Sequence, residues 1–215
     1  MDGAVRDRNA YRVVDDVDAG NAGDETPRPS REEAEDAVRV LIRYIGENPE
    51  REGLLETPKR VVKAWQDWFA GYRADPVEAL AKTFEEVDGY DEIVLMRGIR
   101  VESHCEHHIA PIIGTAYVAY LPAKRVVGIS KLARIVEIFS KRMQVQETLT
   151  AQVADTIDRV LQPRGVAVLI EAEHQCMTTR GVHMPTATTI TTSMRGAFRD
   201  DPEMKREFLR LIGRG

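Results

Sequence analysis

The segment Ser103-His-Cys-Glu-His-His108 holds one of the two cysteines of this 215-residue chain and three of its five histidines. The other cysteine lies far along the chain, in Glu173-His-Gln-Cys176. Both thiols and four of the five histidines therefore fall in two short clusters. A thiolate and neutral imidazoles are the ligands that zinc prefers. The sequence predicts one metal site, assembled from two distant segments.

The spacing within each cluster suits a shared site. Cys105 and His108 are three positions apart, so both side chains can face one point in a turn or helix-like backbone. His174 and Cys176 are two positions apart, so on a strand they project from the same face. Residues 166–173 have the composition of such a strand. If Cys176 completes the site, His174 lies at its rim.

The number of ligands indicates the kind of site. Structural zinc usually has four protein ligands, often in CxxC pairs, and the sequence contains no CxxC. Three ligands such as Cys, His and Cys leave a position for water, which is the catalytic arrangement. Bound zinc can bring the pKa of that water to about 7. His107 and His174 would then be available for proton transfer.

Three other interpretations of the clusters are open. Cys105 and Cys176 could form a disulfide, although nothing in the sequence indicates a secreted protein. A fourth histidine could close the site and make it structural. Lone histidines are often core or surface groups, and His104 and His183 fit that description. The clustering favours a catalytic metal site.

Length and composition place the chain among ordinary globular proteins. It has a net charge of −5 and 43% hydrophobic residues, enough for one sizeable core. No apolar run approaches the length that spans a membrane, and the N-terminus lacks the apolar core of a signal peptide. We expect a cytoplasmic protein with no membrane partner. The acidic balance argues against a nucleic-acid partner.

Breaks in the pattern divide the chain. Residues 1–29 are polar and acid-rich, and we expect a flexible tail there. Residues 30–215 are expected to form a single domain, helical at 30–90 and mixed at 91–215. Ser30-Arg-Glu-Glu33 has capping-box spacing, and Thr57-Pro58 is predicted to cap and start a second helix. The apolar residues of this second helix are expected to face the core: Val61, Val62, Trp65, Trp68 and Phe69.

The later part alternates strands and helices. Strands are predicted at 92–96, 99–103, 114–121, 166–173 and 186–194, and helices from about 130, 146 and 201. This order predicts an α+β domain with a largely antiparallel sheet.

A candidate anion site accompanies the metal site. Ser130-Lys-Leu-Ala-Arg134 falls at a predicted helix start, where free N–H groups favour an anion. Lys131 and Arg134 can reach the same side of that helix. Arg180 closely follows the second cysteine, and Gln146-Glu147 offers groups suited to a purine edge. Each could instead be a solvated surface group, and only their convergence on the metal would make a pocket.

Several motifs together resemble GTP cyclohydrolase I of the zinc-dependent type, from about Arg31 to the C-terminus. They are Asn48-Pro-Glu-Arg-Glu-Gly-Leu54, Thr57-Pro-Lys-Arg60, Cys105-Glu-His-His108, Gly128-Ile-Ser-Lys131 with Arg134, Gln144-Val-Gln-Glu147, and His174-Gln-Cys176 followed by Arg180-Gly181. The sequence departs from the family pattern at Met143, where proline is common, and at Thr148, where arginine is common. Both departures concern local loop geometry.

The resemblance implies a role for each matching residue. Cys105, His108 and Cys176 match the Zn²⁺ ligands, and His107 and His174 match the catalytic histidines. Glu147 with Gln146 matches the guanine anchor. Ser130 matches a residue near the ribose and phosphates, and the remaining matches are triphosphate contacts: Lys131, Arg134, Arg180 and Arg60.

The resemblance also implies a fold, an assembly and a reaction. The family has the tunnelling fold, an antiparallel sheet with helices on one side, here preceded by N-terminal helices. It assembles as a homodecamer of two stacked pentamers with sites between subunits, and it includes allosteric enzymes. The reaction converts GTP and water to formate and 7,8-dihydroneopterin triphosphate, through attack of zinc-activated water at guanine C8. It is the first step of folate and pterin biosynthesis, which supplies tetrahydrofolate for one-carbon metabolism.

Proteins of other classes are also considered. A zinc nucleoside deaminase would activate water too, but its combination of HxE with PCxxC is absent from the sequence. A related pterin enzyme that binds its metal with three histidines would not need two cysteines. A binding protein with structural zinc would hold GTP without turnover, and the presence of His107 and His174 argues against it.

Overall fold

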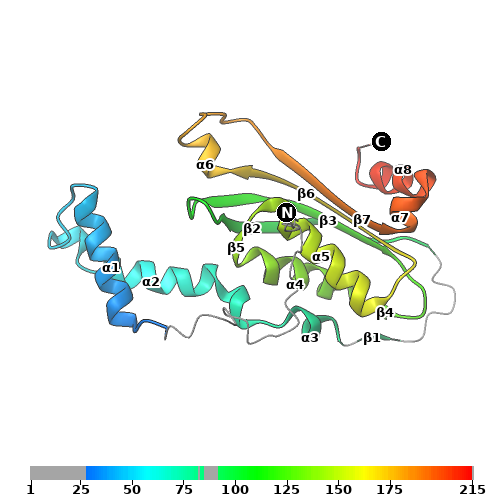
Figure 1. Ribbon diagram of the computed structural model, residues 1–215, viewed down its shortest axis with the longest axis horizontal. Coiled ribbons are helices and arrows are strands. Elements are labelled where there is room, and N and C mark those ends of the chain that lie inside the picture. The colour runs from blue at the N-terminus through cyan, green and yellow to red at the C-terminus, as the bar shows by residue number, and fades with distance from the viewer. Residues whose placement is uncertain (1–27, 82, 85–91, 215) are drawn as a thin grey trace, which may run out of the picture.

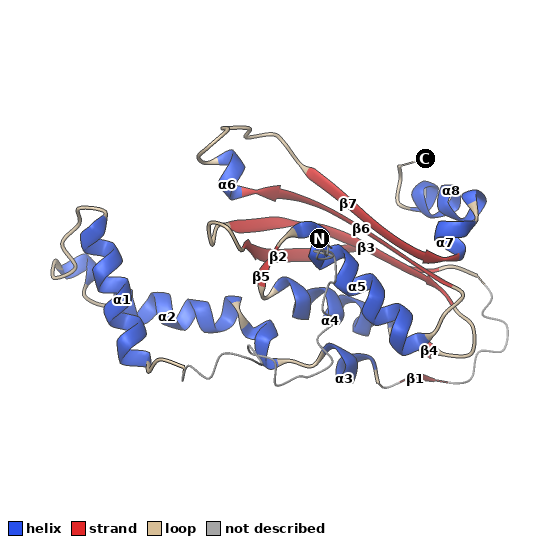
Figure 2. Cartoon of the chain, in the orientation of Figure 1, coloured by secondary structure: helices blue, strands red, loops and turns tan. Residues whose placement is uncertain are grey.

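The computed structural model describes residues 28–81, 83–84 and 92–214, so the predicted tail at 1–29 lies almost wholly outside the described residues. The described part is an α+β structure with a curled mixed sheet (Figures 1 and 2). Its helices are α1 (Arg31–Tyr44), α2 (Thr57–Trp68), α3 (Pro76–Leu80), α4 (Ile129–Ser140), α5 (Gln146–Leu161), α6 (Gln175–Thr178), α7 (Ala197–Asp200) and α8 (Pro202–Leu211), with short 3₁₀ turns η1 (Glu52–Leu54) and η2 (Ala70–Arg73).

The N-terminal helices extend beyond the sheet (Figure 1). The predicted capping box of α1 is confirmed, since the Glu33 N–H donates to Ser30 Oγ and the Ser30 N–H donates to a Glu33 carboxylate oxygen. Helix α2 begins at Thr57 with Pro58 in its first turn, but the cap is Glu56, so the prediction of Thr57 as cap was wrong.

The apolar stripe of α2 does not face the core as predicted. Pro58 is its buried residue, whereas Trp65 and Trp68 are 39% and 48% exposed. The reason is that α2 packs mainly on α1 and meets the sheet at its last turn, where the Trp68 ring lies 5.0 Å from the His104 ring.

The main sheet has the strand order β5-β2-β3-β6-β7. Its strands are β2 (Val94–Cys105), β3 (Pro111–Leu121), β5 (Met143–Gln144), β6 (Gly165–His174) and β7 (Thr189–Gly196), while β1 (Thr83–Phe84) and β4 (Val126–Val127) form a separate pair. The long strands pair antiparallel, as predicted, and β5 pairs parallel with the end of β2.

Helices pack on both faces of the sheet, and the side chains of each strand alternate between these faces. The larger core lies under α4 and α5 and includes Val118 and Val168. The neighbouring residues Ala119 and Leu169 point the other way and pack with Phe198 and Phe208 of α7 and α8. The expectation of helices on one side therefore holds for α4 and α5, while α7 and α8 pack on part of the opposite face (Figure 1).

Strand direction brings the two sequence clusters together. Both β2 and β6 run antiparallel to β3, so they are parallel to each other and their C-terminal ends lie at the same end of the sheet. In the register, His104 lies opposite Pro111 and His174 lies opposite Ile112, which are neighbours on β3. The chain after β6 therefore emerges beside the chain after β2.

Candidate metal centre

Cys105 is the last residue of β2 and opens a tight turn. The Cys105 N–H donates to the Ala110 carbonyl, and the Ile109 N–H donates to the Cys105 carbonyl, both at 2.8 Å. Ile109 closes this turn with a positive φ of 54°. The turn folds His107 and His108 back toward the end of the sheet, next to the Cys105 thiol.

Cys176 reaches the same point from α6. Strand β6 ends at His174, and Cys176 lies in the single helical turn that follows. The prediction that Cys176 projects from a strand was therefore wrong, because the chain turns into a helix at Gln175. The thiol is nevertheless buried beside Cys105.

The two clusters form one three-residue group. One ligand atom from each of Cys105, His108 and Cys176 lies within 4.8 Å of the others, and Nδ1 of His108 is 3.9 Å from the Cys105 sulfur. Both cysteines are buried and free, which does not support the disulfide alternative. Two sulfurs and one imidazole at this separation can hold a metal ion.

The surroundings of Cys176 favour its neutral thiol. Burial raises the pKa of Cys176, and the nearby Cys105 raises it further, while Arg180 acts weakly in the opposite direction. A bound cation would favour the Cys176 thiolate that this environment disfavours. The electrostatics at Cys176 thus suit a site that is completed by a metal.

His107 lies beside this group and is exposed. Its Nδ1 is 3.7 Å from the Cys105 sulfur, and its Nε2 is 3.8 Å from a Glu106 carboxylate oxygen. Within the described part of the chain it does not join the three-residue group as a fourth ligand.

His174 ends β6 at the rim of the group and is partly buried. Burial lowers its pKa, and the negative charge of Glu147 partly offsets that effect. Glu147 is exposed in the first turn of α5, close enough to influence His174. The neutral imidazole, the form that can accept a proton, is therefore favoured at neutral pH.

Gln146 is fully buried next to His174. The Gln146 Oε1 is 2.7 Å from His174 Nε2. The Gln146 Nε2 donates hydrogen bonds toward three acceptors on β6 and β7. These acceptors are the Ile170 carbonyl at 3.1 Å, the Thr189 carbonyl at 2.9 Å and Thr191 Oγ1 at 3.2 Å. The sequence offered no signal for these bonds, because all three partners lie far along the chain.

The predicted anion residues divide into two groups. Arg180 lies at the three-residue group of Cys105, His108 and Cys176, called the metal group below, with Nη1 3.3 Å from His108 Nε2. Ser130 and Lys131 are in the first turn of α4, whose twelve residues span about 18 Å. The far end of α4 leads into β5, which pairs with Cys105, so these two residues lie at the end of the helix remote from the metal group. Arg134, one turn further along α4, is paired with Glu137 at 2.6 Å.

Arg60 is also far from the metal group. It is exposed near the start of α2, and Trp68, the residue of α2 that meets the sheet, is eight positions later, or about 12 Å along the helix. Within one chain the structure therefore gathers Arg180 and Glu147 but not Ser130, Lys131, Arg134 or Arg60.

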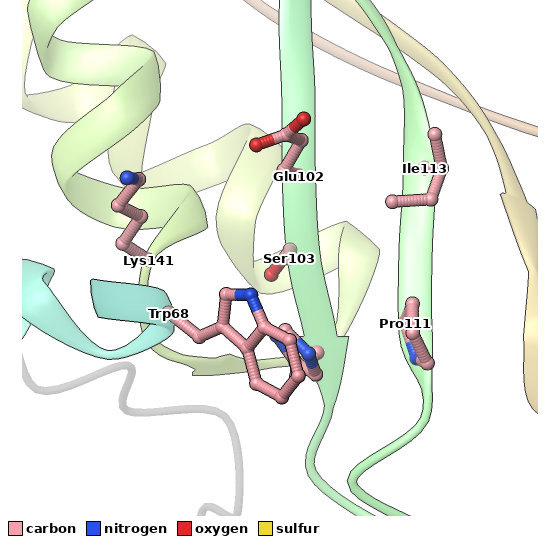
Figure 3. Close-up of a pocket in the computed structure, with 7 residues that line it drawn as sticks. Trp68, Glu102, Ser103, Pro111, Ile113 and Lys141 are labelled. Carbon is pink, nitrogen blue, oxygen red and sulfur yellow. The ribbon is translucent and has the colours of Figure 1, made fainter. Parts of the chain in front are cut away.

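A cavity of about 220 Å³ lies along the C-terminal end of β2 and the start of β3 (Figure 3). Its lining residues are Trp68, Glu102, Ser103, His104, Pro111, Ile113 and Lys141. His104, which the sequence allowed as a core or surface group, is buried between the rings of Trp68 and Phe69. Burial lowers its pKa. None of the three grouped ligands lines this cavity.

No helix in the described ranges is both long enough and apolar enough to cross a membrane.

Comparison with known proteins gives consistent relatives. The family model described as GTP cyclohydrolase I matches residues 34–213. GTP cyclohydrolase 1 of Maricaulis maris is 65% identical over 187 residues, covering 87% of this chain and 91% of the relative. The enzymes of the same name from Hyphomonas neptunium and Allorhizobium ampelinum are 60% and 54% identical, over 88% and 87% of this chain and 92% and 94% of their own.

A comparison with solved structures is weaker. The archaeosine synthase QueF-Like in its apo form aligns with 48% of this chain and 93% of its own, with a TM-score of 0.38 and 16% identity. That likeness is too low to support an argument about the fold.

Proposed function

The chain belongs to the GTP cyclohydrolase I family and is an enzyme of that kind, and on this premise we propose that it hydrolyses GTP to 7,8-dihydroneopterin triphosphate and formate. The observation that carries the proposal is the Cys105–His108–Cys176 group at the edge of the sheet, with His107 and His174 beside it.

The three grouped residues would hold a zinc ion. Two thiol sulfurs and an imidazole nitrogen are soft and borderline donors, which suit zinc better than magnesium or calcium. Three protein ligands leave a coordination position free, and zinc held there would activate a water molecule for attack at guanine C8. Burial of both thiols keeps the donors away from bulk solvent.

The two histidines would move protons during the hydrolysis. His174 has a lowered pKa because it is partly buried, so it is neutral at physiological pH and can accept a proton. His107 is exposed beside Cys105, where a bound substrate could meet it. A base on each side of the ligand group would serve the successive proton transfers that ring opening requires.

Charged groups near the metal would orient GTP. Glu147 can accept hydrogen bonds from the guanine edge, and the family resemblance places Gln146 at the same anchor. Arg180, which follows Cys176 in the second cluster, offers a guanidinium to the phosphates. Holding the base and the phosphates separately would position C8, and positioning of this kind can lower a barrier by several kcal/mol, up to about 7–11.

A second copy of the chain would supply the remaining phosphate contacts. Ser130 and Lys131 are about a helix length from the metal group of their own chain, and Arg134 is about half that length away. Strand β5 pairs with only the last two residues of β2, and β7 is the other edge of the described sheet. Such edges favour pairing with another sheet, which supports the proposed tunnelling fold and homodecamer of two pentamers.

Exposed apolar residues of the N-terminal helices also support assembly. Leu41 is 58% exposed, Tyr44 86% and Ile45 76%. Apolar side chains clustered in this way typically mark an interface. We further propose one domain at 30–215, a cytoplasmic location and a role at the start of folate synthesis.

The test is to incubate purified, zinc-loaded protein with GTP and to assay formate together with a pterin, detected by fluorescence after oxidation. Both products in equal amounts are expected. Formate without pterin would mean ring opening without closure and would contradict the proposed product. Neither product, with GTP bound, would indicate a binding protein and would overturn the proposal.

A further inference from the structure

The buried carboxamide of Gln146 connects His174 to β6 and β7. It lies between His174 Nε2 on one side and three acceptors on the other: the Ile170 and Thr189 carbonyls and Thr191 Oγ1. Gln146 has no exposed surface, so water does not compete for these bonds.

The partners of Gln146 determine which way its amide faces. The carbonyl oxygens of Ile170 and Thr189 can only accept hydrogen bonds, so the NH₂ group must face them. The reversed amide would set its oxygen against these two carbonyl oxygens with no hydrogen between them, which is costly. Oε1 of Gln146 therefore faces His174.

That orientation decides which nitrogen of His174 carries the proton. Oε1 of Gln146 has no hydrogen to donate, so the 2.7 Å contact is a bond that His174 Nε2–H donates. A neutral imidazole has one N–H, and Nδ1 of His174 is then left with its lone pair.

Two threonines complete a consistent set of donors. Thr150 Oγ1 lies 2.7 Å from the backbone carbonyl oxygen of Gln146, which can only accept, so the Thr150 hydroxyl donates there. Thr191 Oγ1, 2.6 Å from Thr150 Oγ1, must then donate to Thr150 and accept from Gln146 Nε2. Every donor in this series of hydrogen bonds thus meets an acceptor, and the series resists reversal of the Gln146 amide.

We propose that Gln146 is a positioning residue that holds His174 in its Nε2–H tautomer, so that Nδ1 is the atom that accepts a proton in the reaction. The inference rests on the proposed function and assigns Gln146 a role other than contact with guanine. When His174 takes a proton at Nδ1 it becomes an imidazolium with two N–H groups. Gln146 Oε1 still accepts from Nε2, so the ring keeps its orientation through the transfer.

The tautomer can be read directly by NMR. Zinc-loaded full-length protein labelled with ¹³C,¹⁵N-histidine has five histidines to resolve, and the His174 signals are assigned by their loss in His174→Gln. We expect a protonated Nε2 and a bare Nδ1 in the wild type. A protonated Nδ1 on neutral His174 would overturn the proposal, and this measurement needs no Gln146 variant to fold.

Substitution separates positioning from a structural or guanine-contact role. Gln146→Met keeps the side-chain length but removes the acceptor, and we expect mixed His174 tautomers and a kcat about 100-fold lower with KM for GTP within about threefold. A raised KM with normal kcat in Gln146→Met would instead indicate guanine contact and overturn the proposal.

The matched control is Gln152→Met on the same helix. Gln152 Oε1 accepts a hydrogen bond from Gln144 Nε2 at 2.9 Å, whereas the partner of His174 Nε2 is Gln146, so kcat and the His174 tautomer should be unchanged. A tautomer shift in this variant as large as in Gln146→Met would contradict a specific role for Gln146. If the wild type makes neither formate nor pterin, the proposed function fails, while the NMR result still decides the tautomer.

Discussion

Cys105 of β2 lies opposite Gln144 of β5 in a parallel pairing that covers two residues of each strand. The Glu106 N–H extends this contact by donating to the Gln144 carbonyl at 3.1 Å. Helix α5 begins two residues after Gln144, so this short pairing sets the start of α5, with Gln146 and Glu147, beside the metal group. The position of the proposed guanine anchor thus depends on the smallest strand of the sheet.

Removal of either thiol should remove the metal and the activity together. Cys105→Ser and Cys176→Ser each leave two ligands, and we expect metal content to fall from about one zinc per chain to near zero with loss of formate production. Elemental analysis and the formate assay check this. Met177→Ser, a change at the exposed neighbour of Cys176, should keep both. Full activity in metal-free protein would show that the ligand assignment is wrong.

His107→Ala should retain zinc but lose turnover. His107 lies outside the three-ligand group, so the expected loss is in proton transfer, about 10²- to 10⁴-fold in kcat. The control is His183→Asn, because His183 is exposed with a φ of 48°, a backbone conformation that asparagine accepts. Near-normal turnover in His107→Ala would exclude it from the mechanism.

Mixed assemblies should recover activity if two copies build each site. Cys105→Ser damages the metal half, and Lys131→Ala with Arg134→Ala damages the α4 half. Random co-assembly of the two inactive proteins would leave roughly a quarter of the sites with both halves intact. Co-assembled Cys105→Ser and Cys176→Ser chains should stay inactive. No recovery in the first mixture, with assembly verified by mass, would contradict a site shared between copies.

Gly71→Ala should destabilise the protein. An added Cβ would lie 2.0 Å from the Ile138 carbonyl oxygen, so η2 would have to move away from α4. We expect a loss of about 1–3 kcal/mol in the free energy of unfolding, measured with denaturant. Gly128→Ala is the matched control, since its Cβ would meet nothing within 4 Å. Equal stability of the two variants would show that the close contact at Gly71 is absent.

Asp158 should make stability depend on pH in the acid range. Burial raises its pKa above 3.8, with Asp155 adding to the shift and Arg195 opposing it. The folded state therefore binds more protons than the unfolded state between the two pKa values, and this contribution to stability is lost as pH rises through them. Asp158→Asn should thus raise Tm at pH 7 more than at pH 4. A larger rise in Tm at pH 4 than at pH 7 would contradict a raised pKa of Asp158.

Local chemistry in the sequence was enough to predict several features. The capping box at Ser30 and Glu33, the helix that starts at Gln146 and the strand at 166–173 each depend on neighbouring residues, and the structure confirms them. The pairing of the two Cys and His clusters could also be inferred, because few residue types bind zinc and the chain has few of them.

The tertiary structure decided what depends on contacts between distant segments. It placed Cys176 on a helical turn, left Trp65 and Trp68 of α2 exposed and set Lys131 about a helix length from the metal group. Such outcomes follow from strand order and register, which no local pattern specifies. The spacing of His174 and Cys176 in the sequence likewise predicted that His174 would lie near the candidate metal ligands, whereas only the packing of α5 against β6 and β7 placed Gln146 Oε1 2.7 Å from His174 Nε2.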